Sequence, residues 1–309
     1  MNNKEFKTID EQIELLKSRG LKIDNEDKLK WYLSSYNYQN FINGYNDLFM
    51  INEDRNKNKY KSIASSNQII NLFNFDRWLS KNILSTIQNI ERKISSSIAY
   101  VLAINLNYYN NDKGGNIFKY EFNNPLIEKM FVKMDFEEWK EMKSRLLDDK
   151  KINKNEKLYK KYNSNSEIPI WSLIIKMSFG DLILILSKVN ENIFFQIMKN
   201  SKICNWENLN SKKEIILIFK IIKDLRNRIC HNNIIYNIEI TDRSKIKPIS
   251  GILKIDLKKA NLLDIVKIIE KLDNDSYISE NVYKQLDKYN DIHEIIKNLI
   301  INKIKNHNL

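Results

Sequence analysis

The stretch LSKNILSTIQNIERKISSSIAYVL, residues 79–102, has the most regular pattern in this 309-residue chain. Its apolar positions recur at spacings of 4, 3, 4, 4 and 3 residues, at Ile83, Ile87, Ile90, Ile94, Ile98 and Val101. This spacing follows the 3.6-residue period of an α-helix and gives one continuous apolar stripe. Apolar residues upstream extend the pattern, so we predict a helix of about 35 residues. We expect Ser66 or Asn67 to cap its start and residues 110–115 to end it.

The composition of the whole chain also favours helices. Hydrophobic residues make up 42% of it, but it has only six Gly and three Pro, fewer than turn-dense β-barrels or glycine-rich nucleotide folds require. We therefore predict an all-α fold. The helices that we expect besides the long one are residues 10–16, a segment from 24, 125–149, 171–177, 181–189, a segment from 211, 261–272, 279–289 and 291–304.

Local signals give the expected organisation. Gly20 is expected to end the first helix, and Asp181 to cap the helix at 181–189. Strand-like residues at 234–240 and 251–257 suggest one small β-hairpin. We expect three regions, namely an N-terminal helical region (1–62), a helical core (63–237) and a C-terminal region with the hairpin and helices (238–309).

A second helix is expected to be central and buried. Ser211, with Glu214 three residues later, forms a capping-box pattern. Apolar residues from Ile215 to Leu225 cover nearly the whole circumference of the helix that follows. Its polar end carries Arg226, Asn227, Arg228 and His231.

The charge balance suggests a polyanionic partner. The chain has 51 Lys and Arg against 39 Asp and Glu, a net charge of +12. Such a charge attracts the phosphates of RNA, DNA or a membrane surface. An AT-rich coding sequence, which enriches Asn, Ile and Lys, explains the same charge without any partner.

Several classes of protein are excluded or disfavoured. Two Cys and three His cannot fill a disulfide framework or a zinc-finger spacing. No apolar run approaches the ~20 residues of a membrane helix, and the polar N-terminus does not resemble a secretory signal. Neither a glycine-rich phosphate loop nor an HExxH motif occurs. We expect a cytoplasmic protein with no membrane contact, no metal site and no cofactor.

Arg226 and His231 are the residues best suited to chemistry. Cleaving RNA without a metal requires proton transfer at the 2′-hydroxyl and the leaving 5′-oxygen, together with stabilisation of the phosphorane charge. Histidine is the side chain that changes protonation near neutral pH, and arginine offers two parallel donors to a phosphate. Two interpretations remain open. The residues form a catalytic pair, or they are cations that complement a helix C-terminus, with His231 as its cap.

Several stretches, in this order, resemble the AbiD/AbiF-like (Abi-2) abortive-infection family of the HEPN superfamily. They are TIDEQIELL (8–16) followed by RGL (19–21), YNY (36–38) followed by GY (44–45), IER (90–92), WSL (171–173) followed by SFG (178–180), and Arg226-Asn227…His231, which resembles the RNxxxH form of the HEPN signature. The resemblance covers roughly residues 8–237.

The resemblance implies a HEPN-like helical bundle with N- and C-terminal extensions, acting in phage defence as a toxin-like, metal-independent endoribonuclease. His231 would then transfer protons, Arg226 would hold the phosphate, and Asn227 would orient the reacting groups. Glu91 resembles a polar position on the facing helix; a surface ion pair with a nearby lysine explains it equally well.

The resemblance also implies partners. HEPN nucleases often build one site from two copies, so a homodimer through the Arg226/His231 helix is expected. Some members of this branch are restrained by a structured non-coding RNA. Candidate contacts to RNA are Arg228, Arg92, Lys150, Lys151, Lys154, Lys160, Lys161, Tyr159, Tyr162, Arg55, Lys57 and Lys59. Their alternative role is a solvated surface.

Two other functions remain open on the sequence. The same residues could hold an RNA without cutting it, as a non-catalytic RNA-binding module. A helical adaptor that recognises a phage protein is the third interpretation, against which the positive charge argues mildly.

Overall fold

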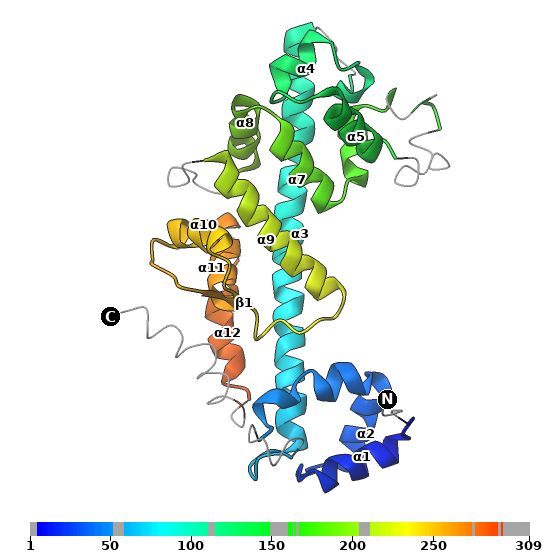
Figure 1. Cartoon of the computed structure of the whole chain (residues 1–309), viewed down its shortest axis with the longest axis vertical. Coiled ribbons are helices and arrows are strands. Elements are labelled where there is room, and N and C mark those ends of the chain that lie inside the picture. The colour runs from blue at the N-terminus through cyan, green and yellow to red at the C-terminus, as the bar shows by residue number, and fades with distance from the viewer. Residues whose placement is uncertain are drawn as a thin grey trace.

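The computed structural model describes residues 5–51, 59–110, 115–148, 160–162, 164, 167–203, 211–273, 276–289 and 292. Figure 1 shows one long helix, α3 (Ser66–Asn110), running the length of the molecule with the other elements arranged along it. The described residues are mostly helical and contain one small two-stranded antiparallel sheet. The predicted all-α class is therefore confirmed.

Helix α3 forms because its apolar stripe is covered from end to end. All five isoleucines of the stripe are fully buried, and Val101 is 3% exposed. The helix has 45 residues rather than the predicted 35, because apolar positions continue back to Ile69 and Ile70. Its cap is Ser65, one residue before the predicted Ser66. The Ser65 hydroxyl accepts a hydrogen bond from the Gln68 N–H at 3.4 Å, and the Gln68 side chain accepts one from the Ser65 N–H at 3.0 Å.

The N-terminal helices surround the first turns of α3 (Figure 1). They are α1 (Ile9–Ser18) and α2 (Glu26–Ser35), followed by a short π-helix, η1 (Gln39–Asn43), and a 3₁₀ turn, η2 (Asn46–Leu48). Gly20 ends α1 as predicted, in the left-handed conformation with φ +88°. The N–H of Leu21 then reaches back to the carbonyl of Leu16 at 3.1 Å, closing a Schellman motif.

The other end of α3 is covered by short helices. They are the 3₁₀ turn η4 (Ile117–Lys119), α4 (Pro125–Met130), α5 (Phe136–Leu146), α6 (Ile170–Leu173), the 3₁₀ turn η6 (Ile174–Lys176), α7 (Phe179–Lys188) and α8 (Glu191–Ser201). The single helix expected at 125–149 is wrong. It breaks because Phe131 forms a β-bridge with Val189, and Asp135 starts a new helix with a capping box.

Two further details of this end differ from the prediction. Ser178 rather than Asp181 is the N-cap of α7, and Asp181 is its capping-box partner, whose carboxylate accepts from the Ser178 N–H at 3.0 Å. Helix α8, which the sequence analysis did not predict, packs along α3. Its N-cap is Asn190, whose side chain accepts from the Ile193 N–H.

Helix α9 (Lys212–Cys230) is the second buried element. Ser211 caps it as predicted, accepting a hydrogen bond from the Glu214 N–H at 3.3 Å. The helix crosses α3 and packs against α7, α8 and α10 (Figure 1). Its buried residues include Phe219, which is fully buried with its ring 6.2 Å from that of Phe179.

The C-terminal region packs on α3 and α9. Strands β1 (Glu239–Ile240) and β2 (Ala260–Asn261) pair antiparallel, with α10 (Arg243–Leu253) between them, and α11 (Leu262–Leu272) and α12 (Ile278–Leu286) follow. The expected hairpin strand at 251–257 is wrong, because Gly251 lies in α10. The carboxylate of Asp273, after α11, accepts a hydrogen bond from Lys93 of α3 at 2.7 Å. The helix expected at 291–304 lies outside the described residues, which include only Ile292 of that segment.

Within the part of the chain that the structure describes, we find no helix with the length and apolar character needed to cross a membrane.

We expect Phe219→Ala to lower the free energy of unfolding by about 3–5 kcal/mol, because it leaves a cavity where α9 meets α7. Phe195→Ala is the matched control, since the Phe195 side chain on α8 is 40% exposed and leaves a smaller cavity. Urea unfolding measures both. Equal losses for the two variants would contradict the central placement of α9.

Candidate active site

The Arg226–His231 motif forms the last turn of α9. The helix ends at Cys230, and His231 is the C-cap with φ −90° and ψ 13°. Its backbone N–H donates to the carbonyl of Asn227 at 3.1 Å, while its side chain is exposed. Asn227 and Arg228 are also exposed. His231 therefore does cap the helix, as one of the two interpretations expected, and its imidazole remains accessible from solvent.

Arg226 is oriented by an acidic residue of α3. Its Nε lies 3.3 Å from Oε1 of Glu91, and the two side chains are 34% and 18% exposed. Neither of these two atoms has a hydrogen-bond partner, so the contact is an ion pair without an aligned hydrogen bond. Glu91 thus pairs with Arg226 rather than with a lysine. The resemblance pointed to this position on the facing helix.

The Glu91 carboxylate is held in an unfavourable environment. Burial raises the pKa of Glu91, and the nearby Arg226 guanidinium only partly offsets that effect. Carboxyl groups with perturbed pKa values cluster at functional sites, and structural ion pairs perturb pKa values as well. The Arg226–Glu91 pair is therefore a site where charge is kept at a cost in stability.

A buried carboxylate on α3 fixes the chain just after His231. Asp76 is fully buried, and its Oδ1 accepts hydrogen bonds from the N–H groups of Ile235 and Tyr236 at 3.0 and 2.7 Å. Its Oδ2 accepts from the Tyr45 hydroxyl at 2.7 Å and from Arg77 at 2.6 Å. Both oxygens are thus satisfied, and the backbone that follows the motif is tied to α3.

Arg77 and Gly44 extend this anchor. Arg77 also donates to the carbonyl of Asn233 at 3.0 Å, two residues after His231. Gly44 lies so close to Ile234 that an added Cβ would be 2.7 Å from the Ile234 Cδ1 atom. The rings of Tyr45 and Tyr236 stack with centroids 5.8 Å apart. The N-terminal region therefore packs directly on the segment that leaves the motif.

The other predicted contacts to RNA are scattered. Arg92 is exposed on α3, one residue after Glu91, and donates to the Asn89 side chain. Arg228 lines a pocket together with Asp224, Glu239 and Lys245.

The basic stretches lie apart from the motif in sequence. Lys59, Lys160 and Lys161 are exposed, and the Lys161 ammonium lies 5.1 Å from the centre of the half-buried Tyr162 ring. The predicted residues outside the described part are Arg55, Lys57, Lys150, Lys151, Lys154 and Tyr159. Among the described residues, Lys59, Lys160 and Lys161 form no ion pair or hydrogen bond with Arg226 or His231, so their role in binding RNA stays a prediction.

Asp76 was not among the residues predicted from the sequence, and neither was its hydrogen bond with Tyr45. A signal was present, because Asp76 lies on the apolar face of α3, four residues after Leu72 and three before Leu79. A charged residue at such a position indicates a buried, fully bonded carboxylate. Among the described residues, no group of three or more His, Cys, Asp or Glu lies close enough together to hold a metal ion.

The chain was compared with protein families, curated proteins and solved structures. The family model for Abi-like proteins matches residues 31–237, which include α3, α9 and the residues that we assign to the site. No curated protein and no solved structure matches the chain significantly.

We expect Asp76→Asn to lower the free energy of unfolding by about 3 kcal/mol or more, because it breaks a buried, fully bonded charge without changing its volume. Tyr45→Phe removes only one donor and should cost about 1 kcal/mol. Urea unfolding compares the two. An Asp76→Asn protein as stable as the parent would show that the anchor is not needed.

Glu91→Gln should have the opposite effect. Since the folded protein holds the Glu91 proton more tightly than the unfolded chain, the carboxyl's contribution to stability falls as the pH rises from about 4.5 through its raised pKa. In the Glu91→Gln variant, the free energy of unfolding should no longer fall over this pH range, and the variant should be at least as stable as the parent at pH 7.

Glu280→Gln is the control for this measurement. Lys284 lowers the pKa of the exposed Glu280, so its contribution to stability is lost as the pH falls, with the opposite sign. Unfolding measured from pH 4 to 8 distinguishes the two. A Glu91→Gln protein that is less stable at pH 7, with an unchanged pH dependence, would contradict the assignment.

Proposed function

The chain belongs to the Abi-like protein family, and we propose on this premise that it is a HEPN-type endoribonuclease that cuts RNA without a metal ion. Membership of the family implies abortive-infection defence against phage. One observation carries the proposal. An accessible imidazole ends α9 five residues after an arginine that is half-buried and paired with a carboxylate of α3. A purely structural helix end needs neither the accessible histidine nor a partly buried Glu91 whose pKa is raised by burial.

The chemistry follows from the residue types. The 2′-oxygen of a ribose attacks the adjacent phosphorus, the bond from phosphorus to the 5′-oxygen breaks, and a 2′,3′-cyclic phosphate and a 5′-hydroxyl result. His231 takes the proton from the 2′-hydroxyl or gives one to the leaving 5′-oxygen. Arg226 donates to the non-bridging oxygens, where negative charge increases in the transition state.

The reaction requires two proton transfers, one from the 2′-hydroxyl and one to the leaving 5′-oxygen. Each chain carries one His231. We therefore propose that two copies pair through the exposed end of α9, so that one imidazole acts as base and the other as acid. The neighbouring Asn227 is exposed on the same turn and orients the reacting groups. The pairing places this end of α9 from both chains around one phosphate.

The net charge supports an RNA partner in addition to the substrate. With a charge of +12 and exposed Arg92, Arg228, Lys160 and Lys161, the protein attracts a long polyanion. A nuclease that acts only during infection must be restrained at other times. We propose that a structured non-coding RNA occupies this basic surface and blocks the site until phage arrives.

We expect His231→Ala to reduce RNA cleavage in EDTA by about 10²–10⁴-fold, the usual contribution of one general acid or base. Incubation of total RNA with each purified protein measures it. His293→Ala, which removes another of the three histidines, is the matched control and should cleave as the parent does.

Arg226→Lys tests the phosphate contact in the same assay. It keeps the charge but loses the planar pair of donors, so cleavage should fall even though the net charge is unchanged. If RNA binds equally to the His231→Ala protein and its parent, and no cleavage depends on His231, the protein is instead a non-catalytic RNA-binding module. A protein that neither binds nor cuts RNA would point to an adaptor for a phage protein.

A further inference from the structure

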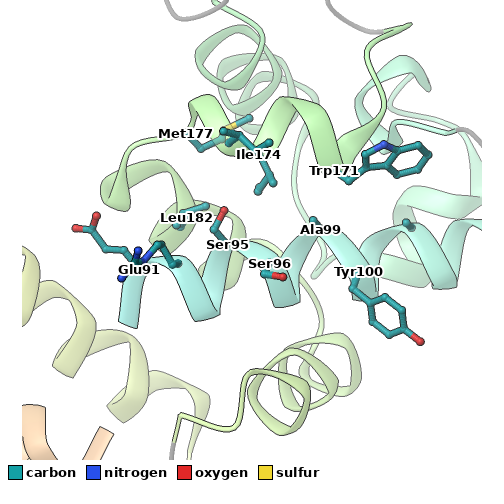
Figure 2. A pocket seen from close by; sticks show the side chains of 12 residues that line it. Glu91, Ser95, Ser96, Ala99, Tyr100, Trp171, Ile174, Met177 and Leu182 are labelled. Atoms are coloured by element: carbon teal, nitrogen blue, oxygen red, sulfur yellow. The ribbon is translucent and has the colours of Figure 1, made fainter. Parts of the chain in front are cut away.

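A pocket of about 700 Å³ begins at Glu91 and continues along α3. Figure 2 shows it between α3 and the segment that carries Trp171, Ile174 and Met177, with Leu182 of α7 at its side. Its lining on α3 runs from Glu91 to Ala103, about 18 Å of helix. The pocket is thus long enough for more than one small ring.

Four of the seven residues of α3 that line the pocket have small side chains: Ser95, Ser96, Ala99 and Ala103. Ser95 and Ala99 follow Glu91 at intervals of four residues, and Figure 2 shows both on the side of α3 that faces Ile174. Tyr100 also lines the pocket, and its ring extends from α3 away from Ile174 in the same view. A planar group can therefore lie against Ser95 and Ala99, between the charged end at Glu91 and the aromatic residues Tyr100 and Trp171.

Trp171 supplies an aromatic wall. It lies at the end of the pocket away from Glu91 (Figure 2), and its side chain is 44% exposed although it is surrounded by core residues of α6. The adjacent Ile175 is 69% exposed. An indole left partly open beside a pocket offers a face on which a nucleobase can stack.

The opposite end of the pocket is charged. Arg92 lines it, and Glu91 holds Arg226 there. Lys223, one turn before Arg226 on α9, lies near the start of α7, where an added Cβ at Gly180 would be 3.8 Å from its Cδ atom. These cations suit phosphates, whereas the interior of the pocket suits rings with a few polar edges, for which Ser95 and Ser96 provide hydroxyl groups.

We propose that this pocket binds the unpaired bases of a single-stranded RNA segment, with one base stacked on Trp171 and the backbone directed toward Arg226. The inference rests on the proposed function, and it adds the site on this chain that holds the bases of the RNA. Bases buried in a duplex cannot reach the pocket, while unstacked bases can. Charge complementarity with the cations at the Glu91 end favours RNA over a second protein chain.

The test measures binding apart from cleavage. All proteins carry His231→Ala, and the ligands are a labelled ten-nucleotide single-stranded RNA, the matching duplex, and an abasic ribose-phosphate strand of the same length. Trp171→Ala should bind the single strand about 5- to 150-fold more weakly, the range for loss of one stacked base. It should bind the abasic strand as its parent does, with an unchanged dependence on salt.

Two further variants complete the design. Ala99→Leu places a larger side chain in the pocket, and leucine is compatible with a helix. This variant should also weaken binding of the single strand but not of the abasic strand. Trp31→Ala removes a tryptophan that is 56% exposed on α2, at the other end of the molecule, and should change nothing. Ala99→Leu keeps the proposal testable should Trp171→Ala fail to fold.

Three results would overturn the proposal. One is equal affinity of Trp171→Ala and its parent for the single strand. Another is an equal loss on the base-containing and abasic strands, or a weaker salt dependence, which would make Trp171 a structural residue. The third is that the parent is a dimer, Trp171→Ala is a monomer, and binding that depends on the bases is unchanged. The pocket would then be a protein interface. Since His231 is absent throughout, failure here is distinct from failure of cleavage.

Discussion

A helix of 45 residues with an apolar stripe along its whole length is stable only if other elements cover that stripe, and this requirement organises the structure. The N-terminal helices cover the first turns of α3. The middle of α3 is covered by α9 and the C-terminal helices, and its far end is covered by α4, α6 and α8. Because α9 must bury its own nearly continuous apolar surface against α3, α7 and α8, its position on α3 is fixed. The polar end of α9 is thereby brought to one defined place.

Two carboxylates of α3 act on that polar end in different ways. Asp76 and Glu91 are 15 residues apart, about 22 Å along the helix. Asp76 is buried with both oxygens fully bonded, and it anchors the backbone after His231. Glu91 is partly buried, its Oε1 lacks a hydrogen-bond partner, its pKa is raised, and it faces Arg226. The first arrangement stabilises the fold, whereas the second leaves a partly exposed charged pair near the end of α9.

Periodicity alone predicted much of this fold. The stripe from Ile83 to Val101 gave α3, and the Ser211 cap with its apolar run gave α9, because both patterns depend only on local spacing. Short elements were harder to predict. Phe131 breaks the helix expected at 125–149 by pairing with Val189, a contact between residues far apart in sequence. No local pattern reports such a contact.

The candidate site shows the same division. The sequence was enough to single out Arg226 and His231 by residue type and by their position at the end of a buried helix. The sequence raised Glu91 only as one of two options, since its partner lies 135 residues away. The anchoring role of Asp76 depends on backbone N–H groups, which no sequence motif displays. The role that we propose for Trp171 depends on the pocket beside it, which only the folded structure shows.

The central claim is that the ribose 2′-hydroxyl is the nucleophile and that side chains of this protein move the protons. Identifying the ends of RNA cut by the purified protein in EDTA tests it most directly. The account predicts 5′-hydroxyl ends and 2′,3′-cyclic phosphates, the products of attack by the 2′-oxygen. Ends that carry a 5′-phosphate and a 3′-hydroxyl, formed when water is the nucleophile, would contradict it.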